Sequence, residues 1–160
     1  MNQKLKELNQ QITQFKELEI AKNCIKPVLG IGPHNSNFMF IGEAPGAEED
    51  KTGEPFVGRS DKLLDELLAS LNLKRNDVYI TNIVKYRPPE NRDPTKIEKE
   101  ICGKFLAEEI QIIKPEVIIT LGRHALNYFF PDEKIALTHG KILIKSLPNN
   151  LEQKILSLYH

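Results

Sequence analysis

The stretch FMFIG at residues 38–42 carries the clearest signal of the fold class. Four consecutive apolar residues that end at a glycine are typical of a short strand that is buried on both faces of a sheet. VIITLG at 117–122 repeats this pattern, and VYI at 78–80 is a shorter example. Strands of this kind need helices on both faces of the sheet, so the three runs predict an α/β protein.

Segments with apolar residues at helical spacing alternate with these runs. We expect helices over residues 3–22, from a cap at Ser60 to Leu71, from Pro94 at the first helical position to Ile113, and over 125–130. Residues 141–147 and 154–159 are weaker strand candidates. The alternation predicts a three-layer α/β/α sandwich with a central, mostly parallel four-stranded sheet. We expect one domain over residues 1–160, in which 1–26 form an N-terminal helical extension.

Composition excludes several classes of protein. The chain has 160 residues, 40% of them hydrophobic, and no apolar run approaches the roughly 18 residues that a membrane span needs. The N-terminus has no apolar segment of the kind found in signal peptides. Cys24 and Cys102 are too few for a disulfide framework or a zinc site built mainly on cysteines. We therefore expect a reduced, cytoplasmic protein without a membrane partner.

The net charge is zero, from 22 basic and 22 acidic residues, which argues against a protein that coats nucleic acid. The charges are nevertheless unevenly distributed. Residues 43–66 carry three basic and eight acidic groups, and residues 67–104 carry eight basic and five acidic groups. Solvated helix faces and loops explain such blocks as readily as a functional surface does.

A polar loop follows the first strand, from Gly42 to Gly58. Glu43 lies one residue beyond the strand end, where parallel sheets bind ligands, and a carboxylate there suits general-base or electrostatic work. Phe56 is placed to offer a flat face to a ligand, but it could equally plug the core. The glycine spacing of this loop matches neither a phosphate-binding P-loop nor a dinucleotide fingerprint.

A second loop follows the second strand. Asn82 lies just beyond the strand end, and a buried amide presents a donor and an acceptor side by side, which matches the edge of a pyrimidine. An asparagine could also simply tie down the turn at this position. Lys85, Arg87 and Arg92 form a small basic patch beside it, sufficient for contacts to a few phosphates.

Four strings in these loops and strands give a more specific indication. They are FIGEAPGAEED at 40–50, TGEPFVG at 52–58, YITNIVKYRPPENRDP at 79–94 and PEVIITLG at 115–122. In this order they resemble the family 4 uracil-DNA glycosylases. The resemblance is dense over residues 28–130 and implies the uracil-DNA glycosylase fold.

The resemblance implies a role for each matching residue. Gly42, Glu43 and Ala44 line the uracil pocket, and Glu43 is the catalytic carboxylate. Glu49 crowds the position of a thymine methyl group, Phe56 stacks on the flipped base, and Asn82 reads its Watson–Crick edge. Arg87 and Arg92, together with Lys85, face the DNA backbone.

The family's second active-site motif begins with a histidine that donates to uracil O2, and His160 fits this position. The wedge loop and the last helix that follow in the family are then missing here. His160 could instead be an unanchored tail residue. We interpret the other histidines, His34, His124 and His139, as loop or surface residues without a role.

The family usually holds a four-iron, four-sulfur cluster on four cysteines. Of these ligand positions, Cys102 is the only one retained, while Phe15, Leu18 and Tyr86 occupy the others and Cys24 falls off the pattern. One thiolate cannot hold such a cluster. We therefore expect no cofactor and no metal, and we expect these side chains to pack where the cluster would sit.

The leading hypothesis is a monomeric, monofunctional repair glycosylase that removes uracil from DNA in base excision repair. Because a base inside a duplex is out of reach, such an enzyme must flip the nucleotide into its pocket. An alternative is a binding module of the same fold that recognises uracil or single-stranded DNA with negligible turnover. A nucleotide-processing enzyme is a third reading, and the lack of a P-loop or a metal-ligand cluster counts against it.

Overall fold

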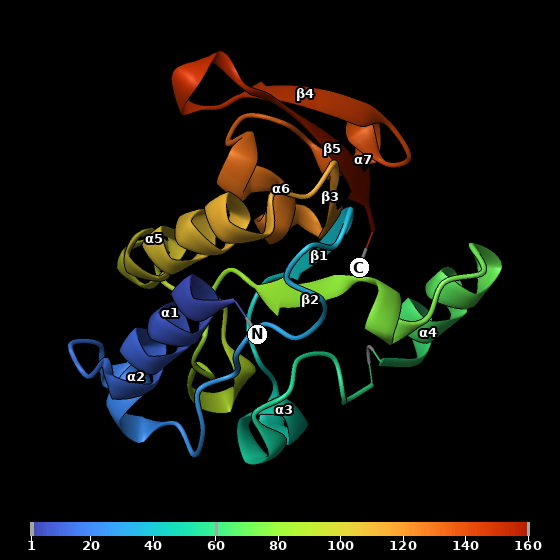
Figure 1. Cartoon of the computed structure of the whole chain (residues 1–160). Coiled ribbons are helices and arrows are strands. Elements are labelled where there is room, and N and C mark those ends of the chain that lie inside the picture. Colours follow the sequence, from blue (N-terminus) through green and yellow to red (C-terminus); the bar gives the residue numbers. More distant parts are fainter. Residues whose placement is uncertain (1, 60, 160) are drawn as a thin grey trace.

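The structure is a computed structural model that describes residues 2–59 and 61–159 (Figure 1). Its centre is a five-stranded sheet with the order β2-β1-β3-β5-β4. The strands are β1 (Phe38–Gly42), β2 (Tyr79–Asn82), β3 (Val117–Leu121), β4 (Ile142–Ser146) and β5 (Glu152–Leu158). Every neighbouring pair is parallel except β4 and β5, which are antiparallel. The predicted α/β class and the mostly parallel sheet are confirmed.

The sheet has one strand more than the four that the sequence predicts. Both weaker candidates form strands, and the short 3-10 turn Pro148–Asn150 joins β4 to β5. β2 and β4 are the two edge strands, and the β4 side chains Ile142 and Ile144 are exposed. β4 is covered less completely than β2, all of whose residues are buried, so its sequence carries a weaker signal than the apolar runs in β1 and β3.

Helices cover both faces of the sheet (Figure 1). They are α1 (Gln3–Gln14), α2 (Glu19–Asn23), α3 (Ala47–Thr52), α4 (Asp61–Ser70), α5 (Lys96–Ile113), α6 (Arg123–Phe129) and α7 (Ile135–Thr138). Met39 and Ile41 of β1 belong to a buried cluster with residues of α1, α2 and α5. Phe40, between them, belongs to a second cluster with residues of α4. This alternation along β1 produces the three layers.

Two helices begin or end at residues other than those expected. The predicted helix over 3–22 is divided into α1 and α2, because Phe15 adopts an extended conformation that ends α1. α5 begins at Lys96 rather than at Pro94. Thr95 caps it by accepting a hydrogen bond from the Glu98 backbone N–H, while the Glu98 carboxylate accepts from Thr95 N–H. The predicted cap Ser60 lies outside the described residues.

Aromatic side chains hold the N-terminal helices against α5. The rings of Phe15 and Tyr86 are stacked with centroids 6.1 Å apart, and Phe15 meets Phe105 edge-on at 5.4 Å. The Tyr86 hydroxyl donates a hydrogen bond of 2.7 Å to the carbonyl of Ile12, in the last turn of α1. Leu18 and Cys102 are buried in the same cluster. Residues distant in the sequence therefore converge on one apolar contact.

Changing Tyr86 to phenylalanine tests the hydrogen bond that this contact contains. The change keeps the ring and removes the donor to Ile12, so we expect a loss of about 1 kcal/mol in the free energy of unfolding. Urea titration followed by circular dichroism measures it. Tyr159→Phe, at a half-exposed ring, is the matched control and should leave the midpoint unchanged. Equal midpoints for both variants would contradict the role given to the Tyr86 hydroxyl.

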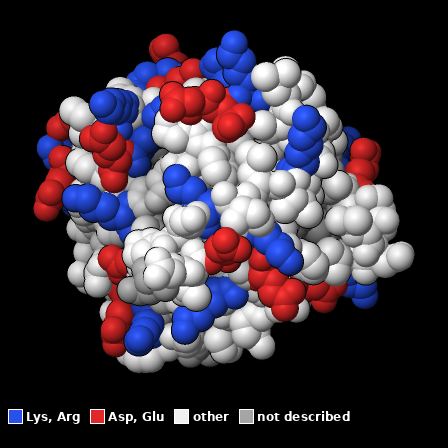
Figure 2. Space-filling model, turned by 90° about the horizontal axis from the view of Figure 1, so that it is seen from above, with Lys and Arg blue, Asp and Glu red and all other residues white. Residues whose placement is uncertain are grey.

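The surface carries both signs of charge. Figure 2 shows Lys and Arg groups interspersed with Asp and Glu groups, with uncharged residues between them, on the face seen from above Figure 1. This mixture agrees with the zero net charge of the chain. Among residues 2–59 and 61–159, no helix is both long and apolar enough to cross a membrane.

Candidate active site

A cavity of about 390 Å³ lies at the edge of the sheet where β1, β2 and β3 end. Its volume is in the range of small-molecule sites. The residues that line it are Glu43, Ala44, Glu49, Phe56, Asn82, Leu121, Gly122, Arg123 and His124. Because parallel strands end at the same edge, the two predicted polar loops meet here. The structure thus brings together five of the residues expected at the site and adds others that follow β3.

Gly42, also expected at the pocket, is not one of the residues that line the cavity but packs against two of them, Asn82 and Phe56. It is paired with Asn82 in the register of β1 and β2. A side chain on Gly42 would collide with the Asn82 side-chain oxygen and with the ring of Phe56. Only a residue without a Cβ fits between these two groups, so Gly42 brings the amide and the ring close together.

Phe56 is held in an unusual backbone conformation. Its φ of 55° lies in the left-handed region, which non-glycine residues seldom adopt. Arg75 donates a hydrogen bond of 2.7 Å to the Phe56 carbonyl and another to the Asp65 carboxylate, so the guanidinium links this loop to α4. The ring is 5% exposed, packs with the α4 cluster and lines the cavity. Phe56 therefore fills the core and faces the cavity at the same time.

Glu49 connects the beginning and the end of the loop that runs from Gly42 to Gly58. Its buried carboxylate accepts hydrogen bonds from the backbone N–H of Gly46 at 3.1 Å, Val57 at 3.2 Å and Gly58 at 2.9 Å. A buried carboxylate needs such donors to be stable. Glu49 also lines the cavity, so it fixes the loop that carries Phe56 and presents part of the wall.

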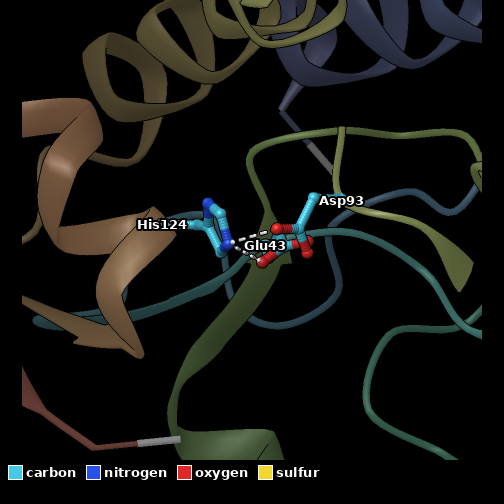
Figure 3. A group of neighbouring side chains, drawn as sticks. All are labelled: Glu43, Asp93 and His124. Carbon is cyan, nitrogen blue, oxygen red and sulfur yellow. Dashed lines mark ion pairs between the residues drawn. The ribbon is translucent and has the colours of Figure 1, made fainter. Parts of the chain in front are cut away.

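Glu43 lies next to His124 and Asp93 (Figure 3). His124 Nε2 lies 3.1 Å from Glu43 Oε2 and 3.4 Å from Asp93 Oδ2. Backbone hydrogen bonds from Ile83 to Gly42 and from Val84 to Glu43 join the ends of β1 and β2 and fix the position of Glu43. His124, for which the sequence alone indicates no role, is one of the residues that line the cavity.

The environment shifts the ionisation of both groups. Burial raises the pKa of Glu43, the nearby Asp93 carboxylate raises this pKa further, and Lys99 and Arg123 oppose the shift. Burial lowers the pKa of His124, Arg123 and Lys99 lower it further, and Asp93 acts in the opposite direction. Neutral imidazole is thus favoured beside a carboxylate that ionises at a higher pH than usual.

The same three side chains are candidate metal ligands. Glu43, Asp93 and His124 each offer a ligand atom, and these atoms lie within 4.8 Å of one another. Two carboxylates and an imidazole suit a divalent cation. The contacts between the imidazole and the carboxylates use the same atoms, so the group is equally explained by mutual pairing.

The end of β5 reaches the same edge of the sheet. Leu158 is paired with Leu121, which lines the cavity, and the Leu158 carbonyl accepts a hydrogen bond of 2.9 Å from Gly122 N–H. β5 therefore ends beside the site. His160, the second predicted catalytic residue, lies outside the described residues.

The sequence matches the uracil DNA glycosylase superfamily over residues 29–160. The chain belongs to this superfamily. Relatives named type-4 uracil-DNA glycosylase include proteins of Archaeoglobus fulgidus (46% identical, over 79% of this chain and 63% of the relative) and Thermotoga maritima (51%, over 72% and 60%). Another, from Saccharolobus solfataricus, is 52% identical over 82% of this chain and 63% of the relative. The chain thus spans less than two thirds of the length of these relatives, and the resemblance to family 4 is confirmed.

The four positions matched to the cluster ligands of family 4 do not fit an iron–sulfur cluster in this superfamily member. Phe15, Leu18, Tyr86 and Cys102 all belong to one apolar cluster, in which Phe15 and Tyr86 contribute stacked aromatic rings rather than thiolates. Cys24 and Cys102 are the two cysteines of the sequence, fewer than the four ligands of such a cluster. Burial raises the pKa of the Cys102 thiol, which disfavours the thiolate form that binds iron.

Lys85 corrects one expectation about the DNA-facing residues of this superfamily member. Its side chain is completely buried, and its ammonium donates to Thr81 Oγ1 at 2.7 Å, to the Asn82 carbonyl at 2.8 Å and to the Glu109 carboxylate. Glu109 also accepts from the Tyr79 hydroxyl. Lys85 therefore cannot contact a DNA backbone. It is an internal residue that links α5 to the end of β2.

Arg87 and Arg92 remain in the loop after β2, closer to solvent. Arg87 donates a hydrogen bond of 2.8 Å to the side-chain oxygen of Asn91. Arg92 donates to both carboxylate oxygens of Glu98 at 2.8 Å, and its side chain is 41% exposed. The basic patch that the sequence predicts is thus reduced to these two arginines.

Proposed function

We propose that the chain hydrolyses the N-glycosidic bond of uracil in DNA and acts in base excision repair. The observation that supports this most strongly is one cavity, lined by a carboxylate (Glu43), an aromatic ring (Phe56) and an amide (Asn82), in a member of the uracil-DNA glycosylase superfamily. The names of the relatives that it resembles point to the same reaction.

The proposed chemistry requires a flipped nucleotide. Phe56 stacks on the base, and the Asn82 amide accepts from uracil N3–H and donates to O4, which cytosine cannot match because its pattern at this edge is reversed. Cleavage breaks the C1′–N1 bond and leaves its electron pair on the base. The ionised Glu43 stabilises the positive sugar or orients the water that adds to C1′, and a proton released from that water neutralises the uracil anion.

Contacts to the base and to the DNA backbone complete this proposal. His160 donates to uracil O2 as the charge on the leaving base develops. Glu49 occupies the wall that a thymine methyl group would meet, and its three backbone hydrogen bonds hold it there. Arg87 and Arg92 contact a few backbone phosphates, so binding should weaken moderately with salt.

We also propose that the protein works as a monomer in the cytoplasm, without an iron–sulfur cluster. Both cysteines are free thiols in the structure, in agreement with a reducing compartment. The apolar contacts among Phe15, Tyr86 and Phe105 occupy the region that the cluster ligands would define. Iron and sulfide analysis of purified protein tests this proposal, and stoichiometric iron would overturn it.

Replacing Glu43 with alanine tests the catalytic proposal. On an oligonucleotide with one uracil, the unmodified chain should produce abasic sites, and Glu43→Ala should lower the single-turnover rate by about 10²–10⁴-fold. Glu48→Ala, an exposed glutamate of the same loop, is the matched control and should excise normally. Tight binding without excision by the unmodified chain would favour a binding module instead. Failure to bind or cleave uracil DNA would exclude both functions.

A further inference from the structure

His124 lines the cavity, but the chemistry proposed above assigns it no role. It lies in the first turn of α6, which begins directly after β3. The turn between them needs Gly122, whose φ of 90° is accessible to glycine and strained for other residues. Because β3 is the neighbour of β1 in the sheet, this turn places the imidazole beside the residue that follows β1.

The imidazole is directed at the carboxylate of Glu43 (Figure 3). Its Nε2 is buried and lies 3.1 Å from Glu43 Oε2 and 3.4 Å from Asp93 Oδ2, without the alignment of a good hydrogen bond to either. Contacts of this kind in a ligand-free site commonly tighten when the substrate binds. The side chains of His124 and Glu43 are 18% and 27% exposed, whereas Asp93 is 63% exposed. Asp93 is thus the more solvated of the two acceptors, and Glu43 is the one inside the cavity.

We propose that His124 is a positioning residue for Glu43. Its Nε2–H holds one oxygen of the carboxylate, so that the other oxygen faces the sugar of the flipped nucleotide. The inference rests on the proposed role of Glu43 in uracil excision.

A neutral donor is the right group for this task. A hydrogen bond from neutral imidazole orients the carboxylate and favours its ionised form, but it leaves the negative charge that an oxocarbenium-like sugar requires. Burial, Arg123 and Lys99 all favour the neutral form of His124, and Asp93 opposes them. A permanent cation at this position would instead cancel much of the charge on Glu43.

Activity measurements separate positioning from a structural role. His124→Ala should slow single-turnover excision about 10- to 100-fold while the affinity for uracil DNA stays the same. His124→Gln keeps an N–H donor near the Nε2 position and cannot titrate, so it should recover most of the rate. Rescue by His124→Gln is the readout that a merely structural role of the imidazole would not give, because glutamine restores the N–H donor beside Glu43 but not the ring. His34→Ala, at an exposed histidine, is the control.

The outcomes distinguish this inference from the function on which it rests. If His124→Ala matches the unmodified chain in rate while Glu43→Ala is inactive, the inference is wrong and the function stands. If Glu43→Ala remains active, both the catalytic proposal and this inference are wrong.

Nitrogen NMR of the imidazole gives a readout that does not depend on turnover. It should show the Nε2–H tautomer, and an Nδ1–H tautomer would overturn the contact.

Discussion

Replacing Lys85 with methionine is expected to lower the free energy of unfolding by about 3–5 kcal/mol. The change keeps most of the apolar stem but leaves the Glu109 carboxylate buried without its cation. It also removes the hydrogen bonds of the ammonium to Thr81 and to the Asn82 carbonyl. Urea and thermal unfolding followed by circular dichroism measure the loss.

Two further variants make this prediction specific. Lys85→Met combined with Glu109→Gln removes both charges, so it should regain a large part of the stability that the single change loses. Lys96→Met breaks a pair whose two side chains are 88% and 62% exposed, and it should cost about 0.5 kcal/mol or less. If Lys85→Met were no more destabilising than Lys96→Met, the buried pair of Lys85 and Glu109 would not stabilise the fold as predicted.

Gly42→Ala should reduce uracil excision by about 10²-fold or more. The added methyl group would collide with the Asn82 side-chain oxygen and with the Phe56 ring, so at least one of the two must move. Both surround the proposed base position, and Phe56 is held by the hydrogen bond from Arg75 to its carbonyl. Single-turnover excision and binding of a uracil oligonucleotide measure the effect.

The control for this change is the same variant on undamaged DNA. The backbone contacts proposed for Arg87 and Arg92 do not involve the pocket, so affinity for DNA without uracil should be unchanged. Circular dichroism should also confirm that Gly42→Ala is folded. A folded variant that excises uracil at close to the normal rate would contradict the close packing of Gly42, Asn82 and Phe56.

The central strands were predictable because their sequences are apolar on both faces, as in the run at 38–42. The two strands at the β4 side of the sheet were harder to predict. β4 is partly exposed, and its partner β5 has buried side chains only at alternate positions. The break between α1 and α2 depends on Phe15 leaving the helix to meet Tyr86 and Phe105. Helical spacing alone does not contain that information, because both partners are distant in the sequence.

The same reasoning explains what could be predicted of the site. Glu43 and Asn82 follow the ends of adjacent parallel strands, so their meeting follows from topology. Lys85 was misplaced because its partner Glu109 lies 24 residues further along, on the buried side of α5. His124 was missed because its partner belongs to another loop, although its place three residues beyond β3 was a usable signal.

The packing of Phe15, Tyr86 and Phe105 bears on how the protein matures in the cell. A fold that docks its first helices through metal–thiolate bonds depends on iron supply, on cluster assembly and on protection from oxygen. Aromatic burial depends on none of these. The N-terminal helices should therefore dock as the polypeptide folds, equally well in iron-starved and in aerated cells, and the uracil excision that we propose should not depend on iron supply.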